Sequence, residues 1–488
     1  MVENEAEQPE AEAELPTLSD EDISMILSKV PIGNLPACAA TCKHWSIVLH
    51  GDGMLWSEVF TKRFGGSVDP TEARHACCRS MSTIRSIGMR QPQEPARFSK
   101  RAGSAAGTLG GYVIISGGAS NGFQFANHID VWEPATDRTP QGRVVATALM
   151  PHGDPLPKRW QHSAVRWGGE LLLYGGQDAG RGHPCGLLHV LNVTGGGGGR
   201  GNKPKIISMR VPLTRCADDK LAPSVVLPLL NWPCEGPAVT GHSARVMEDA
   251  GTSTSFMLSF GGKAPGGLIT NLLWRLQLPT RHTLSDLSRA IEWRLLEAAG
   301  SAPAPRYCHS AVDISRGWLI FGGWAERRNQ AADIGQLNHG TVFLNDLHVL
   351  ELPAMCWCAL AVAGSVPRGR CQSVMTASAD EEIVLLFGGA CHHDPKPGQA
   401  YGDMVMDLYD VVLLHLPTLT WLPQKGLPSN YQQRGGTNTL IRTDRERCFI
   451  FGGMNSDEGN DEPNFLNDLT ELVGLEAGSS WKARQEAG

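Results

Sequence analysis

Short apolar runs that end in two adjacent glycines recur along most of this chain. Three of these runs are Ile114–Gly118, Leu172–Gly176 and Leu319–Gly323. The first glycines of all six runs lie 58 to 86 residues apart, at Gly117, Gly175, Gly261, Gly322, Gly388 and Gly452. A period of this length indicates a repeated supersecondary unit rather than isolated strands.

Each unit contains more than its glycine pair. A polar lead-in segment precedes the apolar run; it is clearest in Arg159–Ala164 and Arg306–Ala311 and partial in Gly241–Ala244. A second apolar run follows the glycines, as in Leu344–Leu350 and Tyr409–Leu414. In three units a tryptophan comes 31 to 34 residues after the second glycine: Trp293, Trp357 and Trp421. This order predicts four strands per unit, joined by turns.

The repeated unit predicts how the sheets pack. A four-stranded antiparallel sheet has two apolar faces and is not stable alone, whereas radially stacked sheets cover one another. Glycine pairs allow sharp bends and close backbone approach near the axis, and a large tryptophan fills the gap that widens outward. We therefore predict an all-β, six-bladed β-propeller. Glycine-rich hairpins in an unrelated sandwich are the alternative, and they do not explain the recurring tryptophan.

These motifs resemble kelch repeats, which form β-propellers, and the resemblance covers residues 83–474. Units one and two lack the outer tryptophan, and units one, five and six lack a clear His-Ser pair. The stretch from Gly195 to about Pro237 is expected to be an insertion-bearing loop. Thr83–Ile87, with residue 88, is strand-like, and we expect it to complete the last blade, because joining the chain ends removes both sheet edges. The alternative is closure by the C-terminus through Trp481.

Residues 15–62 have a helical rather than a strand pattern. Leu18, Ile23, Ile26, Leu27 and Val30 follow helical spacing after a possible Ser19-Asp20 cap, and two shorter apolar stretches follow. Three short helices bury little surface alone, so the module needs either the propeller or a partner protein. We expect an acidic disordered tail at 1–14, a linker at 63–82 and a C-terminal tail at 475–488.

The same module resembles an F-box, through Leu-Pro, Ile-Leu, Leu, Cys-Lys-x-Trp and Leu-Trp in order. Asn34 stands where that family often has an acid. The resemblance implies docking onto the Skp adaptor of a cullin–RING (SCF) ubiquitin ligase through Leu15, Pro16, Ile23, Ile26, Leu27, Leu35, Cys42 and Trp45. The alternative is a helical cap on the propeller. The combination resembles F-box/kelch proteins, including the plant Zeitlupe type, without that type's light-sensing domain.

Composition and charge exclude several classes of protein. The chain is 41% hydrophobic with 56 Gly and 31 Pro, which argues against disorder throughout. Six of its seven net negative charges come from glutamates in the first 14 residues, so the near-neutral remainder offers no footprint for nucleic acid. No apolar run approaches the ~18 residues of a membrane helix. The 13 cysteines include no Cys-x-x-Cys pair and suggest reduced thiols in the cytoplasm or nucleus.

Candidate target-binding residues gather where antiparallel strands place the lead-in segments and the segments after the glycine pairs on one face. A cationic and aromatic rim suited to an acidic peptide is expected there, formed by Arg97, Arg159, Arg306, Arg368, Trp324, His392 and His393. The alternative for each arginine is a structural role, with its guanidinium bonded to loop carbonyls. No metal or cofactor is expected, because adjacent residues such as Cys391–Asp394 rarely converge on one ion.

The leading functional hypothesis is a non-catalytic substrate receptor, whose helices bind the ligase and whose propeller holds a protein target near it. The alternative is a propeller scaffold, or a metal-dependent small-molecule enzyme, with a helical cap. Some kelch enzymes bind iron through Glu, Asp and His spaced four apart. In this chain the pattern starts at Glu133 and Asp137 but continues with Gln141.

Overall fold

A computed structural model describes part of the chain, which divides into two units, Met1–Met81 and Ser82–Gly488. In the first unit only Ser57 and Thr61, both helical, are described. The predicted tail 1–14, F-box-like module 15–62 and linker 63–82 therefore lie almost wholly outside the described residues. In the second unit these are 88–90, 98–134, 142–180, 182–194, 204–215, 236–248, 254–279, 291–326, 341–352, 354–392, 405–422, 439–443, 447–455, 464–473 and 475.

The described part of the second unit is built from strands, and six of its sheets have four or five strands each. We number them one to six in chain order. Their first strands are β2 (Ala105–Leu109), β10 (Ser163–Trp167), β17 (Ser243–Glu248), β22 (Ser310–Ile314), β27 (Val374–Ala377) and β33 (Thr439–Arg442). Their second strands, which end at the glycine pairs or continue past them, are β3 (Tyr112–Ser116), β11 (Glu170–Tyr174), β18 (Ser255–Phe260), β23 (Gly317–Glu326), β28 (Ile383–Phe387) and β34 (Cys448–Phe451).

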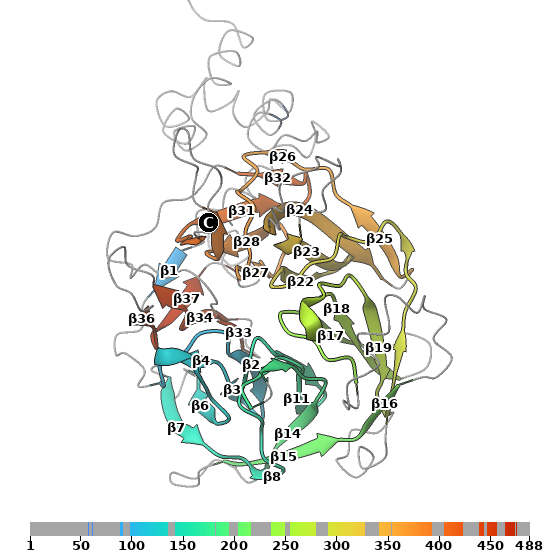
Figure 1. The fold of residues 1–488 in the computed structure, drawn as a ribbon. Coiled ribbons are helices and arrows are strands. Elements are labelled where there is room, and N and C mark those ends of the chain that lie inside the picture. Colours follow the sequence, from blue (N-terminus) through green and yellow to red (C-terminus); the bar gives the residue numbers. More distant parts are fainter. Residues whose placement is uncertain are drawn as a thin grey trace, which may run out of the picture. The chain divides into compact units, whose positions relative to one another are not determined.

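The two remaining strands complete each sheet on the outside. The third strands are β6 (Ile129–Glu133), β14 (Leu188–Thr194), β19 (Leu273–Gln277), β24 (Thr341–Glu351), β31 (Val411–His415) and β37 (Leu469–Val473). The fourth strands are β7 (Arg143–Leu149), β15 (Lys205–Val211), β20 (Ile291–Leu295), β25 (Cys356–Ala359), β32 (Thr420–Trp421) and β1 (Gly88–Arg90). All four strands pair antiparallel, and the sheets stand side by side around a common centre, the arrangement of a β-propeller (Figure 1).

Short parallel strands extend four of the sheets. They are β8 (His152–Gly153), β16 (Leu213–Arg215), β21 (Ala299–Gly300) and β26 (Ala363–Gly364), which pair with the fourth strands of sheets two to five. β15 and β16 fall within the stretch from Gly195 to Pro237. The expectation that this whole stretch is an insertion-bearing loop was therefore wrong, because it supplies the outer strand of sheet two.

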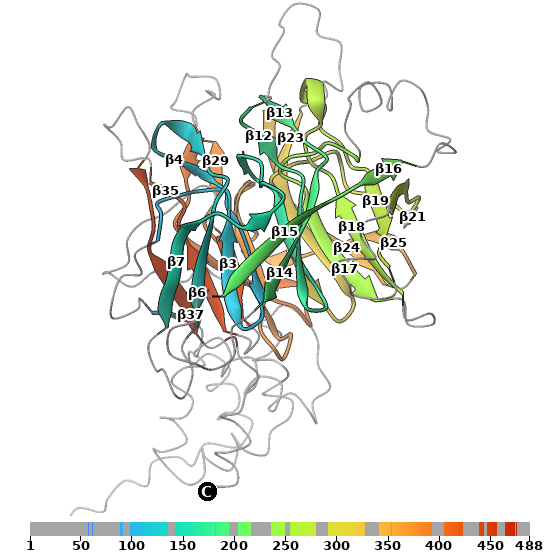
Figure 2. The same ribbon diagram turned by 90° about the horizontal axis from the view of Figure 1, so that it is seen from below.

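One face of the ring carries the lead-in segments together with the segments after the glycine pairs, and we call it the loop face. Backbone bridges join the two kinds of segment, as at Ala102 with Ala119 and Tyr307 with Trp324. Five small elements of this face lie on the same side of the ring in Figure 2: β4 (Ala119–Ser120), β12 (Gln177–Asp178), β13 (His183–Pro184), β29 (Ala390–His392) and β35 (Met454–Asn455). Four of the other short strands pair with these: β5 (Gln124–Phe125), β9 (Arg159–Trp160), β30 (Val405–Asp407) and β36 (Asn464–Phe465). Two 3₁₀ turns, η2 (Asn121–Phe123) and η3 (Pro265–Gly267), also follow glycine pairs. The prediction that these segments share a face is confirmed.

The glycine pairs lie where neighbouring sheets approach most closely. Gly117 has a φ of +59°, and a Cβ there would stand 2.6 Å from the carbonyl oxygen of Arg159. The next residue, Gly118, donates its N–H to that oxygen at 2.9 Å. The same bond runs from Gly323 to Arg370 at 2.9 Å. The predicted role of the pairs, a sharp bend and close backbone contact near the axis, is confirmed.

The outer tryptophans lie between sheets, as predicted. Each packs on the aromatic residue that precedes the glycine pair of the preceding sheet, which fills the widening gap. The ring centroids are 4.8 Å apart for Trp293 and Tyr174, 4.7 Å for Trp357 and Phe260, and 5.3 Å for Trp421 and Phe321. Sheet one, which lacks an outer tryptophan, uses Trp132 of its third strand instead, 4.9 Å from Phe449 of sheet six.

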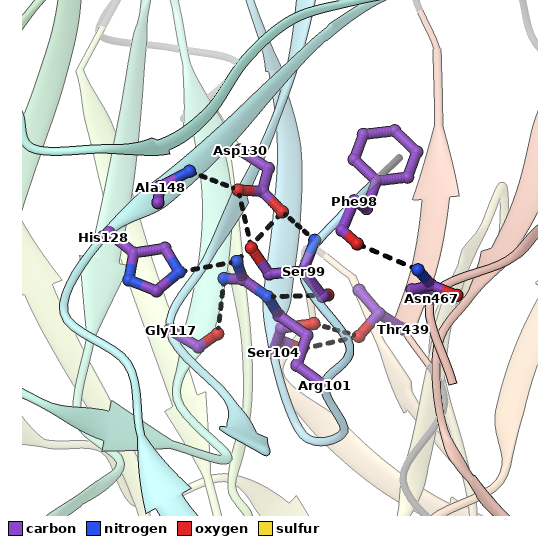
Figure 3. Close-up of polar contacts among 10 residues, drawn as sticks. All are labelled: Phe98, Ser99, Arg101, Ser104, Gly117, His128, Asp130, Ala148, Thr439 and Asn467. Carbon is purple, nitrogen blue, oxygen red and sulfur yellow. Dashed lines mark hydrogen bonds and ion pairs between the residues drawn. The ribbon is translucent and has the colours of Figure 1, made fainter. Parts of the chain in front are cut away.

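Sheet six is completed by a strand from the N-terminal side of the propeller. β1 pairs antiparallel with β37, with Gly88 opposite Val473 and Arg90 opposite Glu471. Closure by the N-terminal strand is thus confirmed, although the strand observed is 88–90 and residues 83–87 lie outside the described part. Figure 3 shows the neighbouring seam, where Asn467 Nδ2 donates to Phe98 O at 3.0 Å and Thr439 Oγ1 to Ser104 O at 2.9 Å.

The described cysteines behave mainly as core residues, as expected from their surroundings. Five are buried and take part in no disulfide: Cys185, Cys308, Cys371, Cys391 and Cys448. Among the described residues there is no helix with the length and apolar character that crossing a bilayer requires.

Candidate target-binding face

Four lead-in arginines are buried beneath the loop face. Arg101, Arg159, Arg306 and Arg370 are at most 1% exposed. Each donates an Nη1 hydrogen to the carbonyl of the first glycine of its own sheet, at 2.9, 3.1, 2.9 and 3.1 Å respectively. These side chains therefore fix the bend that each glycine pair makes, and they do not reach solvent.

This burial corrects the predicted cationic rim. Arg159 and Arg306 are wrong as surface anchors, and the alternative, a guanidinium bonded to loop carbonyls, is confirmed for both. In sheet five the residue that corresponds to them is Arg370, while Arg368 is exposed. Arg97 and His393 lie outside the described residues, and of His392 only the backbone, in β29, is described.

Carboxylates complete three of these arginine sites. Arg306 binds Asp346 through two hydrogen bonds of 2.7 Å, and His348 Nε2 lies 2.9 Å from the same carboxylate. Although burial opposes ionisation of Asp346, its bonds to Arg306 and His348 hold its pKa well below the usual range. Arg370 pairs with Asp410 in the same way, with bonds of 2.5 and 2.8 Å.

In sheet one the carboxylate that pairs with the lead-in arginine lies two residues later along the third strand than in sheets four and five. Arg101 Nη2 lies 2.9 Å from Asp130 Oδ2 and 2.9 Å from His128 Nε2 (Figure 3). Because a guanidinium only donates, the His128 ring accepts through Nε2 and is neutral. Burial and then the charge of Arg101 lower the pKa of His128. The network fixes the lead-in segment of sheet one.

Serine–histidine pairs join neighbouring first strands and resemble a nucleophile beside a base. Ser163 Oγ lies 3.0 Å from His242 Nε2, and Ser243 Oγ 2.7 Å from His309 Nε2. Between sheets four and five the same place holds Ser310 and Ser373 at 2.7 Å, with no histidine. Repetition around the ring shows that these bonds tie sheets together, so we assign them no catalytic role.

The exposed cations of the loop face adjoin the buried arginines. Lys100 and Lys158 directly precede Arg101 and Arg159, and both are exposed. Lys263 is half-buried, with its Nζ 5.6 Å from the ring centroid of Tyr307. Sequence reasoning missed these lysines because it took the arginines of the repeat for the surface charge. Counting back 16 residues from the first glycine would have placed Arg101, Arg159 and Arg306 at equivalent buried positions.

Trp324 lies on the loop face, as predicted, but its indole is largely covered. It stacks on Tyr307 at 5.5 Å and 16°, and Phe343 packs at 5.2 Å. The side chain is half-buried, and its Nε1–H is shielded from water with no hydrogen-bond partner in the described structure. Trp324 therefore contributes to packing as well as to the surface.

A second aromatic group on the loop face was not foreseen. Phe123 in η2 and Phe125 in β5 follow the glycine pair of sheet one, Trp160 in β9 leads into sheet two, and Phe465 in β36 follows the glycine pair of sheet six. These four residues are in contact, and we call them the aromatic cluster. Phe123 is 51% exposed. No sequence signal marked it, because Phe123 and Phe125 belong to no repeated position.

Among the described residues, no three His, Cys, Asp or Glu side chains are placed to hold a metal ion.

Comparisons with known proteins agree with the repeat pattern. Residues 231–453 match the KLHDC2/KLHL20/DRC7 Kelch-repeats domain. The chain is 25% identical to Acyl-CoA-binding domain-containing protein 5 of Arabidopsis thaliana over 335 residues, 66% of this chain and 40% of that protein. It is 28% identical to human Host cell factor 2 over 194 residues, 37% of this chain and 20% of that protein. It thus spans 40% or less of these relatives.

Among solved structures, the structure of YjhT aligns with a TM-score of 0.46 and 13% identity, covering 78% of this chain and 95% of that one. Strand order and glycine pairs define the class, an all-β propeller, and residues 231–453 of it match a Kelch-repeats domain.

Proposed function

We propose that this protein is a non-catalytic substrate receptor, in which a six-bladed kelch propeller captures a protein target on its loop face. The observation that carries the proposal is the loop face itself. It combines exposed Lys100, Lys158 and Arg368 with half-buried Trp324 and half-exposed Phe123. Aromatic side chains and arginine are enriched at protein interfaces, and lysines at the rim of an interface steer an acidic partner towards it.

The buried polar groups support binding rather than chemistry. The four buried lead-in arginines, the carboxylates paired with three of them and the serine–histidine pairs bond to one another or to backbone carbonyls and hold the sheets in place. A receptor of this kind acts by proximity, since it raises the effective concentration of a target beside an enzyme.

The second part of the proposal concerns residues 15–62. We propose that they form an F-box that docks the Skp adaptor and cullin of an SCF ubiquitin ligase, so that the target is ubiquitinated in the cytoplasm or nucleus. Its support is the sequence pattern alone, with Leu15, Pro16, Ile23, Ile26, Leu27, Leu35, Cys42 and Trp45 as the docking residues.

Co-purification of the full chain with the Skp adaptor tests the ligase assignment. Replacing Ile26 and Leu27 together with Asp should abolish adaptor binding, because burying an unpaired carboxylate costs several kcal/mol. Ser28→Asp in the same segment is the matched control and should bind normally. If the double variant binds as well as wild type, the docking face is misassigned. If wild type captures targets but no adaptor, the protein is a binding scaffold outside SCF ligases.

A further inference from the structure

The aromatic cluster connects three sheets at one place on the loop face. Phe125 stacks on Trp160 with ring centroids 5.5 Å apart and an interplanar angle of 29°. Phe123 stands edge-on to Trp160 at 6.1 Å and to Phe465 at 5.8 Å. Phe465 is fully buried, whereas Phe123 is 51% exposed. The cluster thus has a rigid base and one protruding ring.

The backbone holds that protruding ring in a strained conformation. Phe123 ends the short turn η2 between β4 and β5 with a φ of +52°, in the left-handed region that favours glycine. Stability alone would place glycine or asparagine at this position and a polar side chain at the surface. A large apolar residue at such a position, half-exposed, is typical of a binding surface.

Two exposed lysines flank the cluster. Lys100 precedes Arg101, whose N–H bonds to the carbonyl of Leu466, the neighbour of Phe465. Lys158 precedes Arg159, whose N–H bonds to the carbonyl of Ala126, the neighbour of Phe125. The backbone segments that carry the two lysines are therefore bonded next to two different members of the cluster.

Among the described residues, the carboxylates nearest to the two lysines are buried or already bonded. Asp130 is fully buried and paired with Arg101, and Asp178 is buried in β12. Exposed Asp154, four residues before Lys158, accepts the backbone N–H of Arg210, and Lys100 and Lys158 are the exposed cations of these described segments. An acidic segment is attracted to such a surface, and a basic one is repelled.

The base of the cluster also offers an unused donor. The Nε1–H of Trp160 is shielded from water and has no hydrogen-bond partner among the described residues.

We propose that the aromatic cluster with Lys100 and Lys158 docks a linear segment of a partner protein, in which a large apolar side chain is flanked by acidic residues. The apolar side chain packs against Phe123, and the acidic residues pair with the two lysines. This site rests on the proposed target-binding function of the loop face and is independent of the ligase assignment. It is also separate from Trp324, which packs in a different cluster.

Fluorescence anisotropy with synthetic dodecapeptides tests the site on the full chain. The probe carries a central Trp flanked on each side by Asp and Glu. Two matched probes replace the Trp by Gly, or the acids by Lys. We expect the acidic Trp probe alone to bind, with an affinity that falls as salt rises.

Variants assign the binding to named residues. Phe123→Ala should weaken the acidic Trp probe by about tenfold or more, and Lys100→Glu with Lys158→Glu should do the same and remove most of the salt dependence. Met150→Ala, which truncates another exposed apolar side chain, is the control and should bind normally. Melting curves separate a loss of binding from a loss of folding, and the lysine variants leave the aromatic packing intact.

Several outcomes overturn the site: no binding of the acidic Trp probe by wild type, equal binding of the lysine probe, or unchanged binding by both the Phe123 and the lysine variants. Targets captured from cells through Trp324 but not Phe123 would leave the proposed function standing and remove this site. If the wild-type chain captures no target at all, the proposed function itself is wrong.

Discussion

Ser243 on the first strand of sheet three lies 2.7 Å from His309 of sheet four, Oγ to Nε2. Ser163 and His242 make the same contact one sheet earlier. Each bond joins the serine of one sheet to the histidine of the next, so the adjacent His-Ser residues of one lead-in segment bond in opposite directions around the ring. These bonds lie among buried groups and make the contacts between sheets sensitive to acid.

The buried histidines should make the propeller less stable as the pH falls below 6.5. Burial first, and then the charges of Arg159 and Arg306, lower the pKa of His242 and His309 to about 3. In the unfolded chain their pKa is about 6.5, so protons bind the unfolded state first. The stabilisation is complete above pH 6.5 and declines by up to about 1.4 kcal/mol per pH unit for each histidine as the pH falls towards 3.

Urea denaturation between pH 7.5 and 4.5 measures this effect. Replacing both His242 and His309 with Asn should flatten the decline, while His152→Asn, at an exposed position, should leave it unchanged. An equally steep decline in the double variant would mean that other groups cause the acid sensitivity.

Arg306 should be required for stability. Arg306→Ala leaves the Gly322 carbonyl and Asp346 without their donor, and we expect a loss of about 2–3 kcal/mol in the free energy of unfolding. The matched control is Arg143→Ala, whose side chain is 64% exposed and pairs with Glu133 at the surface; it should change the free energy of unfolding by less than about 1 kcal/mol. Denaturant unfolding of the two variants provides the comparison, and equal losses would contradict the structural role.

Much of the fold could be predicted because its signals are local and repeated. Glycine pairs such as Gly117-Gly118 mark bends that only glycine allows, and Trp293, Trp357 and Trp421 mark the outer strands. Where a sheet lacks the outer tryptophan, its outer strand was not predicted. Sheet two has no outer tryptophan, so its strand Lys205–Val211 was taken for part of a loop.

The candidate site was predicted less well, because exposure is not a local property. Arginines such as Arg159 and Arg306 are typical anchors of binding surfaces. Here their guanidinium groups are buried, because they donate hydrogen bonds to the carbonyls of Gly175 and Gly322 at the glycine bends. Phe123 reaches the surface only because Trp160 and Phe465, from other sheets, support it. Contacts between residues this far apart in the chain produce no regular spacing in the sequence from which they could be predicted.

Trp324 should contribute to target capture. Trp324→Ala is expected to weaken capture by about 2 kcal/mol, as for other buried aromatic anchors. Because the indole packs on Tyr307 and Phe343, the same change should also lower the melting temperature. Trp324→Phe keeps a stacked ring and separates the two effects. Pull-downs of cellular targets that are identical for all three proteins would exclude Trp324 as an anchor.

The strand Gly88–Arg90 should decide whether the propeller closes. Deleting residues 1–81 keeps β1, so the remaining chain should stay soluble with a nearly unchanged melting temperature. Deleting residues 1–92 removes β1 and exposes the edge of β37, whose Leu472 and Val473 lose their pairing partners. An unpaired edge promotes aggregation, and the packing of sheet six should weaken with it. Light scattering and melting curves of the two truncated proteins make the comparison. If the shorter chain is as soluble and heat-stable as the longer one, β1 is dispensable and another segment must cover that edge.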